Sequence, residues 1–184
     1  MAGVGVSVDD VIAFWFETLE PAQWYAQSNA LDGMIAARFG ALHAAAARCE
    51  LFDWRRSPKG SLAEIIVLDQ FSRNILRGTA GAFAHDAVAL ALAQEAVRAG
   101  ADAALPAVQR AFLYLPYMHS ESLAIHAEAM TLFTAPGMET NLDFERQHKA
   151  IVDHFGRYPH RNAVLNRASS PEELAFLATP GSSF

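Results

Sequence analysis

Three segments of the sequence place polar side chains where an apolar helix face is expected, and each could take part in binding or catalysis. The first is centred on Asp69, which lies four residues after Ile65 and four before Arg73. Residues at this spacing are neighbours on a helix, so the carboxylate and the guanidinium can pair on one face. Because burying a charge is costly unless it is paired and hydrogen-bonded, the segment indicates either a structural ion pair or, with Asn74, the lining of a cleft.

Two histidines stand in equally unusual positions. His148 follows Phe144 by four residues, which places it on the apolar face of a predicted helix, as a core histidine or as part of a site. His119 lies at a predicted helix start, where free amide donors and the helix dipole favour an anion, although capping by Ser120 explains the same position. Either histidine would act as a general base if Asp69 lay within hydrogen-bonding reach.

The third segment is a basic cluster near the end of an otherwise acidic chain. Between positions 157 and 167 it contains Arg157, His160, Arg161, Asn162 and Arg167. Arginine forms bidentate hydrogen bonds to carboxylates and phosphates, and an asparagine can complete such a site. The alternative is that these arginines bond carbonyls at helix ends and hold the C-terminal segment in place.

Composition and motif content restrict the function classes. The 184 residues carry a net charge of −6, which disfavours the basic field that generic nucleic-acid binding requires. The sequence has no His-Glu-x-x-His or His-x-x-x-His spacing and no glycine-rich nucleotide loop, so neither a metal nor a cofactor is predicted.

Cysteine content and hydropathy indicate the compartment. The single cysteine, Cys49, excludes an internal disulfide and fits a reducing environment. The first residues lack the basic region of a signal peptide, and no apolar run reaches the roughly 18 residues that a membrane span requires. We therefore expect a cytoplasmic protein that has no membrane partner.

Helix start and stop signals account for almost the whole chain and predict an all-α fold of about eight to nine helices in one domain, residues 1–184. The predicted helices cover about residues 8–20, 31–48, 61–77, 87–99, 106–116, 120–133, 140–155, 161–167 and 171 onward, and no segment has the pattern of a strand. Short links between successive helices favour antiparallel packing, as in a bundle or a stack of helix pairs.

Local residue patterns set several of these boundaries. Ser61 and Glu64 form a predicted capping box for the third helix, and Ser170 is a predicted N-cap for the last. Asp86 is predicted to cap the fourth helix. Pro116 is expected to kink or end the fifth, because proline lacks the amide hydrogen that continues a helix.

The same unusual segments carry a family resemblance. The stretches Val67–Asn74, Leu115–Glu121 and His154–Asn162 resemble, in this order, three motifs of the bacterial TPR-like family known as domain of unknown function 924 (DUF924). Ser72 stands where the family motif has proline, a residue that would kink the helix at this point. The resemblance implies an all-α, TPR-like fold and a cytosolic bacterial protein, and it implies no established activity.

Three functional hypotheses follow from these observations. The first is a binding module whose polar groove holds a small anionic molecule or a peptide terminus. The second is a hydrolase in which His119 or His148 is the general base and Asp69 orients it. The third is a structural or oligomerisation protein whose polar residues only satisfy backbone groups. The candidate ligand-binding residues are Asp69, Arg73, Asn74, His119, His148, Arg157, His160, Arg161 and Asn162.

Overall fold

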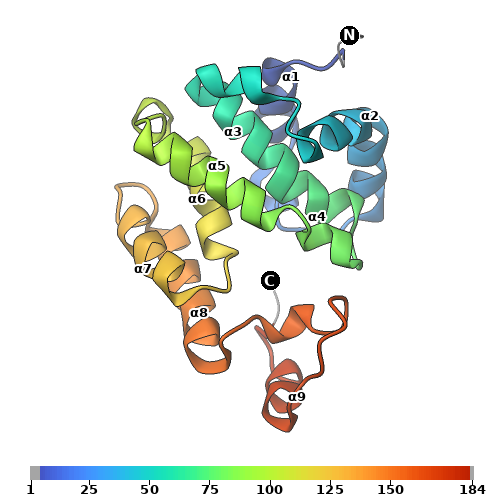
Figure 1. Ribbon diagram of the computed structural model, residues 1–184, viewed down its shortest axis with the longest axis vertical. Coiled ribbons are helices and arrows are strands. Elements are labelled where there is room, and N and C mark those ends of the chain that lie inside the picture. The colour runs from blue at the N-terminus through green and yellow to red at the C-terminus, as the bar shows by residue number, and fades with distance from the viewer. Residues whose placement is uncertain (1–4, 183–184) are drawn as a thin grey trace.

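The computed structural model describes residues 5–182 and is built from helices (Figure 1). They are α1 (Val8–Ala13), α2 (Asn29–Ala47), α3 (Pro58–Ile66), α4 (Ser72–Ile75), α5 (Asp86–Arg98), α6 (Ala107–Met118), α7 (Leu123–Leu132), α8 (Glu139–Phe155) and α9 (Pro171–Leu177). Short π and 3-10 turns join them, and residues 5–182 contain no strand. The predicted all-α fold is confirmed, whereas the TPR-like arrangement stays a prediction. The expectation that no signal peptide is present rests in part on residues 1–4, which lie outside the residues that the structure describes.

One continuous buried helix runs through the centre of the molecule. It consists of α3, the π turn η4 (Val67–Phe71) and α4, and every residue from Gly60 to Phe71 is buried. Such π turns inside helices are often found at functional sites, because the extra residue shifts the side chains that follow it. Asp69 and Gln70 lie in this turn, so two polar side chains are placed deep inside the protein.

Aromatic rings pack around the π turn and hold it in place. Phe71 lies 4.8 Å from Phe39 of α2 and 5.7 Å from Trp15, measured between ring centroids. Trp15 in turn meets Phe112 of α6 edge to face at 5.7 Å. Edge-to-face and tilted pairs at these separations stabilise a core beyond the area they bury. The turn that carries Asp69 is therefore packed against α2 on one side and against Trp15 on another.

The central helix begins earlier than predicted. Its N-cap is Ser57, whose side chain accepts a hydrogen bond from the Gly60 amide at 3.1 Å, and Pro58 occupies the first helical position. The predicted capping box at Ser61 is wrong, because Ser61 is already a buried residue within the helix. Proline is well suited to the first helical turn, where its missing amide hydrogen has no intrahelical partner to lose.

Four other predicted boundaries need correction. His119 does not lie at a helix start capped by Ser120; it is the C-cap of α6, and α7 begins at Leu123. Asp86 is the first residue of α5 rather than its cap, and the residue at the cap position, His85, makes no side-chain cap hydrogen bond. Pro116 does not end α6, which continues to Met118. Between residues 161 and 167 no α-helix forms in the described structure; instead, a 3-10 turn, η7, covers Pro159–Arg161. The predicted cap at Ser170 is confirmed, with a reciprocal capping box to Glu173.

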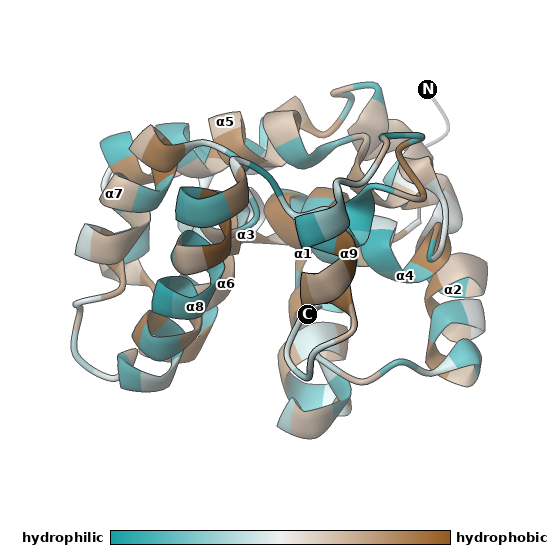
Figure 2. Ribbon diagram, turned by 90° about the horizontal axis from the view of Figure 1, so that it is seen from below, coloured by the Kyte–Doolittle hydropathy of each residue, from teal (hydrophilic) through white to brown (hydrophobic). Residues whose placement is uncertain are grey.

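Ion pairs hold the segment after α8 against the helical body. Arg167 donates to both oxygens of Glu121 at 2.6 and 2.9 Å, and Glu121 also accepts the backbone amide of Tyr158 at 2.7 Å. The Tyr158 hydroxyl donates to the carbonyl of Met118 at 2.6 Å. These contacts position η7 next to the end of α6. Figure 2 shows α9 set apart from α6, α7 and α8 on this side of the molecule.

The buried hydrophobic residues of the described structure form a large cluster around the central helix and a small one made of Ile151, Val152 and Tyr158. In Figure 2 hydrophilic and hydrophobic residues both appear along α8, whose buried residues include His148, Ile151 and Val152. Among the described helices, none is both long and apolar enough to cross a membrane.

Gly60 offers a test of how tightly the start of the central helix is packed. A Cβ atom at this position would lie 2.0 Å from the Trp54 carbonyl oxygen, a backbone atom that cannot move aside cheaply. We expect Gly60→Ala to lower the free energy of unfolding by roughly 1–3 kcal/mol, the usual cost of overpacking. Urea unfolding followed by circular dichroism measures this change.

Gly40, within α2, is the matched control, because a Cβ there would meet nothing within 4 Å. Alanine is the better helix former, so Gly40→Ala should raise the free energy of unfolding by about 0.5–1 kcal/mol. Equal effects of the two substitutions would contradict the close contact at Gly60.

Candidate functional site

A cavity of about 300 Å³ lies where the central helix, the end of α6, α8 and η7 come together. The loop after the 3-10 turn η2 (Pro21–Gln23) and the turn η5 (Ala80–Phe83) close its remaining sides. The lining residues are Trp24, Tyr25, Ala26, Gln70, Arg73, Asn74, Arg77, Gly78, Ala82, Phe83, Leu115, Met118, His119, Asn141, Phe144, His148, His160 and Arg161.

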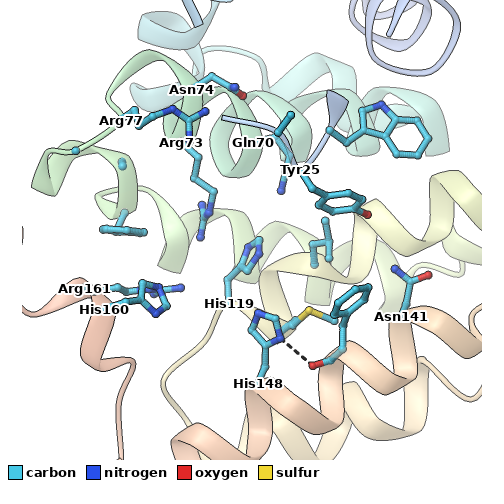
Figure 3. Close-up of a pocket in the computed structure, with 18 residues that line it drawn as sticks. Tyr25, Gln70, Arg73, Asn74, Arg77, His119, Asn141, His148, His160 and Arg161 are labelled. Atoms are coloured by element: carbon cyan, nitrogen blue, oxygen red, sulfur yellow. Dashed lines mark hydrogen bonds between the residues drawn. The ribbon is translucent and has the colours of Figure 1, made fainter. Parts of the chain in front are cut away.

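The lining divides into an apolar part and a part rich in hydrogen-bond donors. Three arginines and three histidines line the cavity, and no carboxylate does so among the described residues. In Figure 3, Tyr25 and Asn141 lie on one side, Arg161 and His160 on the other, and His119 and His148 between them. The cavity thus offers ring surface at one end and N–H donors at the other.

Carboxylates lie directly behind the cavity arginines. Arg73 forms a bidentate pair with Asp86 at 2.9 and 3.0 Å and also approaches the Asp69 carboxylate at 3.1 Å. Arg77 pairs with Asp32 at 2.5 and 2.9 Å. The positive charge of these two guanidiniums is therefore largely matched by acidic groups outside the lining.

Asp69, which lies behind the cavity wall, forms a dyad with His119, which lines the cavity. Its side chain is 1% exposed and accepts from His119 Nδ1 at 2.7 Å and from Gln70 at 2.5 Å. Burial alone would raise the pKa of Asp69, but the charge of Arg73 and the His119 hydrogen bond outweigh it and hold this pKa far below its usual range. An ionised carboxylate can only accept, so Nδ1 of His119 carries the proton and Nε2 does not.

Arg161 is the least satisfied charged group in the cavity. Its side chain is 8% exposed, and its guanidinium lies 4.6 Å from the ring centroids of both Phe83 and Tyr158. It makes one long hydrogen bond, 3.3 Å, to Asp86, and its Nε has no hydrogen-bond partner among the described residues. Burial and the neighbouring charge of Arg73 lower the pKa of Arg161.

The other two cavity histidines are neutral near pH 7. Burial lowers the pKa of His148 to about 3, and its Nδ1 donates to the Phe144 carbonyl at 2.8 Å (Figure 3). Burial, followed by the charge of Arg161, lowers the pKa of His160 to about 4. Nδ1 of His160 is buried, and no partner for it exists within residues 5–182. Unsatisfied buried polar atoms of this kind call for an explanation, and a ligand is one.

Most of the residues singled out from the sequence come together here. Six line the cavity: Arg73, Asn74, His119, His148, His160 and Arg161. Asp69 lies behind them in contact with His119. Two lie elsewhere: Arg157 pairs with Glu173 at 2.7 Å and donates to the Ala168 carbonyl, and Asn162 bonds Arg167 and Ser169. These two residues hold the C-terminal segment together, as the structural alternative proposed.

The sequence patterns did not reveal three contributors. Tyr25 and Asn141 reach the cavity from a loop and from the first turn of α8, and neither stands out by spacing or charge. Asp86 pairs with both Arg73 and Arg161, a role hidden by its position at a predicted helix start. No sequence pattern pairs Asp86 with Arg73, because the two residues lie 13 positions apart and on different helices.

The fold and its cavity can be set beside known proteins. A solved structure of a protein of unknown function from Agrobacterium tumefaciens matches with a TM-score of 0.89 and 40% sequence identity, covering 93% of this chain and 96% of that chain. A comparison with curated proteins gave no significant match. The model of a family described as "Bacterial protein of unknown function (DUF924)" matches residues 11–181. The chain therefore belongs to the DUF924 family.

Proposed function

We propose that the cavity binds a small molecule that has a carboxylate or phosphate group at one end and an apolar, preferably aromatic, portion at the other. The observation that carries this proposal is Arg161, a buried guanidinium with one long hydrogen bond and an unpartnered Nε. A buried donor without a partner costs roughly 1–3 kcal/mol, more if it is charged, and an anion would supply the missing acceptors.

The size and the lining of the cavity select the class of ligand. A volume of about 300 Å³ is at the lower end of small-molecule sites, so a compact ligand fits better than several residues of a peptide. Met118 and Phe144 contribute apolar surface to the lining, and Tyr25 contributes a ring on the side opposite Arg161 (Figure 3). A ring-bearing anion can use both parts of the lining at once, which a bare inorganic ion cannot do.

Charge balance explains why affinity would depend on hydrogen bonds more than on net charge. Arg73 and Arg77 are already paired with Asp86 and Asp32, and the cavity histidines carry no charge at pH 7. The incoming anion therefore gains N–H donors that are held in place by the protein, and little long-range attraction.

The first test measures thermal shifts with phenylphosphate, benzenesulfonate and inorganic phosphate. Ligand that binds the folded state raises the melting temperature by mass action, so the two aromatic anions should give larger shifts than inorganic phosphate. Arg161→Met keeps an apolar stem between Phe83 and Tyr158 but removes the donors. It should weaken binding by about ten- to a hundredfold, which corresponds to loss of a charged hydrogen bond.

Arg157→Met is the matched control, since it removes one arginine of the same segment that pairs with Glu173 outside the cavity. Its ligand-induced shift should equal that of the wild type, even if its melting temperature without ligand is lower. The proposal is wrong if no anion shifts the wild-type transition, or if Arg161→Met responds as strongly as Arg157→Met.

The second test uses pH. A bound anion next to His160 favours the imidazolium, so the pKa of His160, about 4 without ligand, must rise in the complex. Binding then takes up a proton, and the affinity increases as pH falls, by up to about tenfold per pH unit for one proton. Benzenesulfonate keeps its charge throughout, so titration calorimetry between about pH 8 and pH 5.5 isolates the protein's contribution.

His160→Gln should flatten this pH dependence. His154→Gln is the control, because His154 is exposed, pairs with Glu172 and does not line the cavity. A constant affinity for benzenesulfonate across the range would show that no cavity histidine titrates on binding.

A further inference from the structure

We infer that the cavity is also catalytic, with His119 as the general base that activates a water molecule for hydrolysis of a small anionic carboxylic ester, and with Asp69 as the residue that orients it. The inference rests on the proposed binding of anions and adds a reaction to it. Its basis is the geometry of the Asp69–His119 pair at the cavity wall, where a 2.7 Å hydrogen bond joins the two side chains.

Asp69 is held so that it can only support the imidazole in one orientation. Gln70 donates to its Oδ2, while Arg73 Nη1 approaches Oδ1 at 3.1 Å and donates to the Asp69 backbone carbonyl at 2.7 Å. Nδ1 of His119 donates to Oδ1, so the ring cannot flip without losing this bond. Nε2, the unprotonated nitrogen, makes no hydrogen bond to any described residue of the chain, and His119 lines the cavity.

A second histidine–carboxylate pair in the same protein shows what a structural pair looks like. His126 and Glu145 are both 0% exposed and lie 2.6 Å apart. The other ring nitrogen of His126 is occupied by the Ser120 carbonyl at 2.8 Å, so His126 faces no cavity atom and has no free lone pair. His119 differs on both counts. Hydrogen bonds occupy both ring nitrogens of His126, whereas Nε2 of His119, a residue that lines the cavity, has no hydrogen-bond partner among the described residues.

The lining also determines the nucleophile. None of the described residues that line the cavity is a serine, threonine or cysteine. Water is therefore the attacking group, and the unprotonated Nε2 of a neutral imidazole can accept its proton. Burial, with the charge of Arg73, lowers the pKa of His119 and so keeps the imidazole in this neutral form.

The reaction balances with ester and water alone. Water gives a proton to Nε2 of His119 as its oxygen bonds to the carbonyl carbon, and the carbonyl electron pair moves onto the oxygen. The tetrahedral anion then reforms the C=O bond and breaks the bond to the alcohol oxygen, which takes the proton back from Nε2. The products are a carboxylic acid and an alcohol. Asp69 stays ionised and stabilises the transient imidazolium through Nδ1.

The position of His119 indicates which esters would react. Figure 3 places its ring between the side of the cavity that holds Arg161 and the side that holds Tyr25. A substrate whose anionic group reaches Arg161 and whose apolar portion lies towards Tyr25 brings its central bonds next to His119. An ester with a negative charge should thus be preferred over a neutral one of similar length.

The test compares mono-(4-nitrophenyl) glutarate, which is anionic, with neutral 4-nitrophenyl butyrate. Wild-type protein should hydrolyse the glutarate ester with saturation kinetics and a higher kcat/KM than the butyrate ester. His119→Gln should lower kcat/KM for the glutarate ester by roughly 10²–10⁴-fold, the usual contribution of a general base. Asp69→Asn should reduce kcat, because an amide facing Nδ1 no longer selects the reactive tautomer.

The pH profile and an exposed histidine supply the controls. The wild-type rate should rise with pH through the titration of His119 and then stay level, since only the neutral imidazole accepts a proton. His154→Gln removes a surface histidine outside the cavity and should leave the rate unchanged, which excludes non-specific imidazole catalysis.

Binding of benzenesulfonate, measured in parallel, separates this inference from the proposed function. Retained binding with lost turnover in His119→Gln supports a catalytic His119. If wild-type protein binds the sulfonate but hydrolyses neither ester faster than His119→Gln does, the catalytic inference is wrong and the binding proposal stands. If the sulfonate does not bind, the proposed function fails, and the inference that rests on it fails as well.

Discussion

The polar network at the cavity depends on one buried carboxylate. Asp69 lies in a π turn within the buried central helix, where an unpaired charge would be very costly. Gln70, Arg73 and His119 satisfy it from two different helices. Two of these partners need further contacts of their own. Arg73 has more donors than Asp69 can accept from, and His119 needs space for its ring.

Asp86 supplies the second acceptor of Arg73, and the same carboxylate also contacts Arg161 of η7. Asp86 accepts from Arg73 in bidentate geometry and leaves only a 3.3 Å contact for Arg161. Arg161 is thus drawn to the cavity by a carboxylate that is already engaged, while Phe83 and Tyr158 sandwich its guanidinium. Cation–π contacts offset part of the burial cost but supply no hydrogen-bond acceptor. The incomplete end of this chain of pairings is the place where we propose that an anion binds.

Local contacts of the site follow from the sequence, and distant ones do not. The four-residue spacing of Asp69 and Arg73 predicts a pair on one helix face, and the two meet at 3.1 Å. The Asp69–His119 bond joins residues 50 positions apart and depends on where α6 ends against the π turn. Helical periodicity contains no information on that distance. For the same reason, helical periodicity predicts the all-α class but does not place Tyr25, which lies on an irregular loop, at the cavity.

The order of the elements along the chain has a consequence for biosynthesis. The rings that contact Trp15 and Phe71, among them Phe39 and Phe112, all precede position 119, but Arg161 and His160 follow some forty residues later. A nascent chain can therefore bury these aromatic residues and pair Asp69 with Arg73 and His119 before the end of the cavity that carries Arg161 exists. The anion that we propose for this cavity would therefore bind only after the C-terminal segment has been translated.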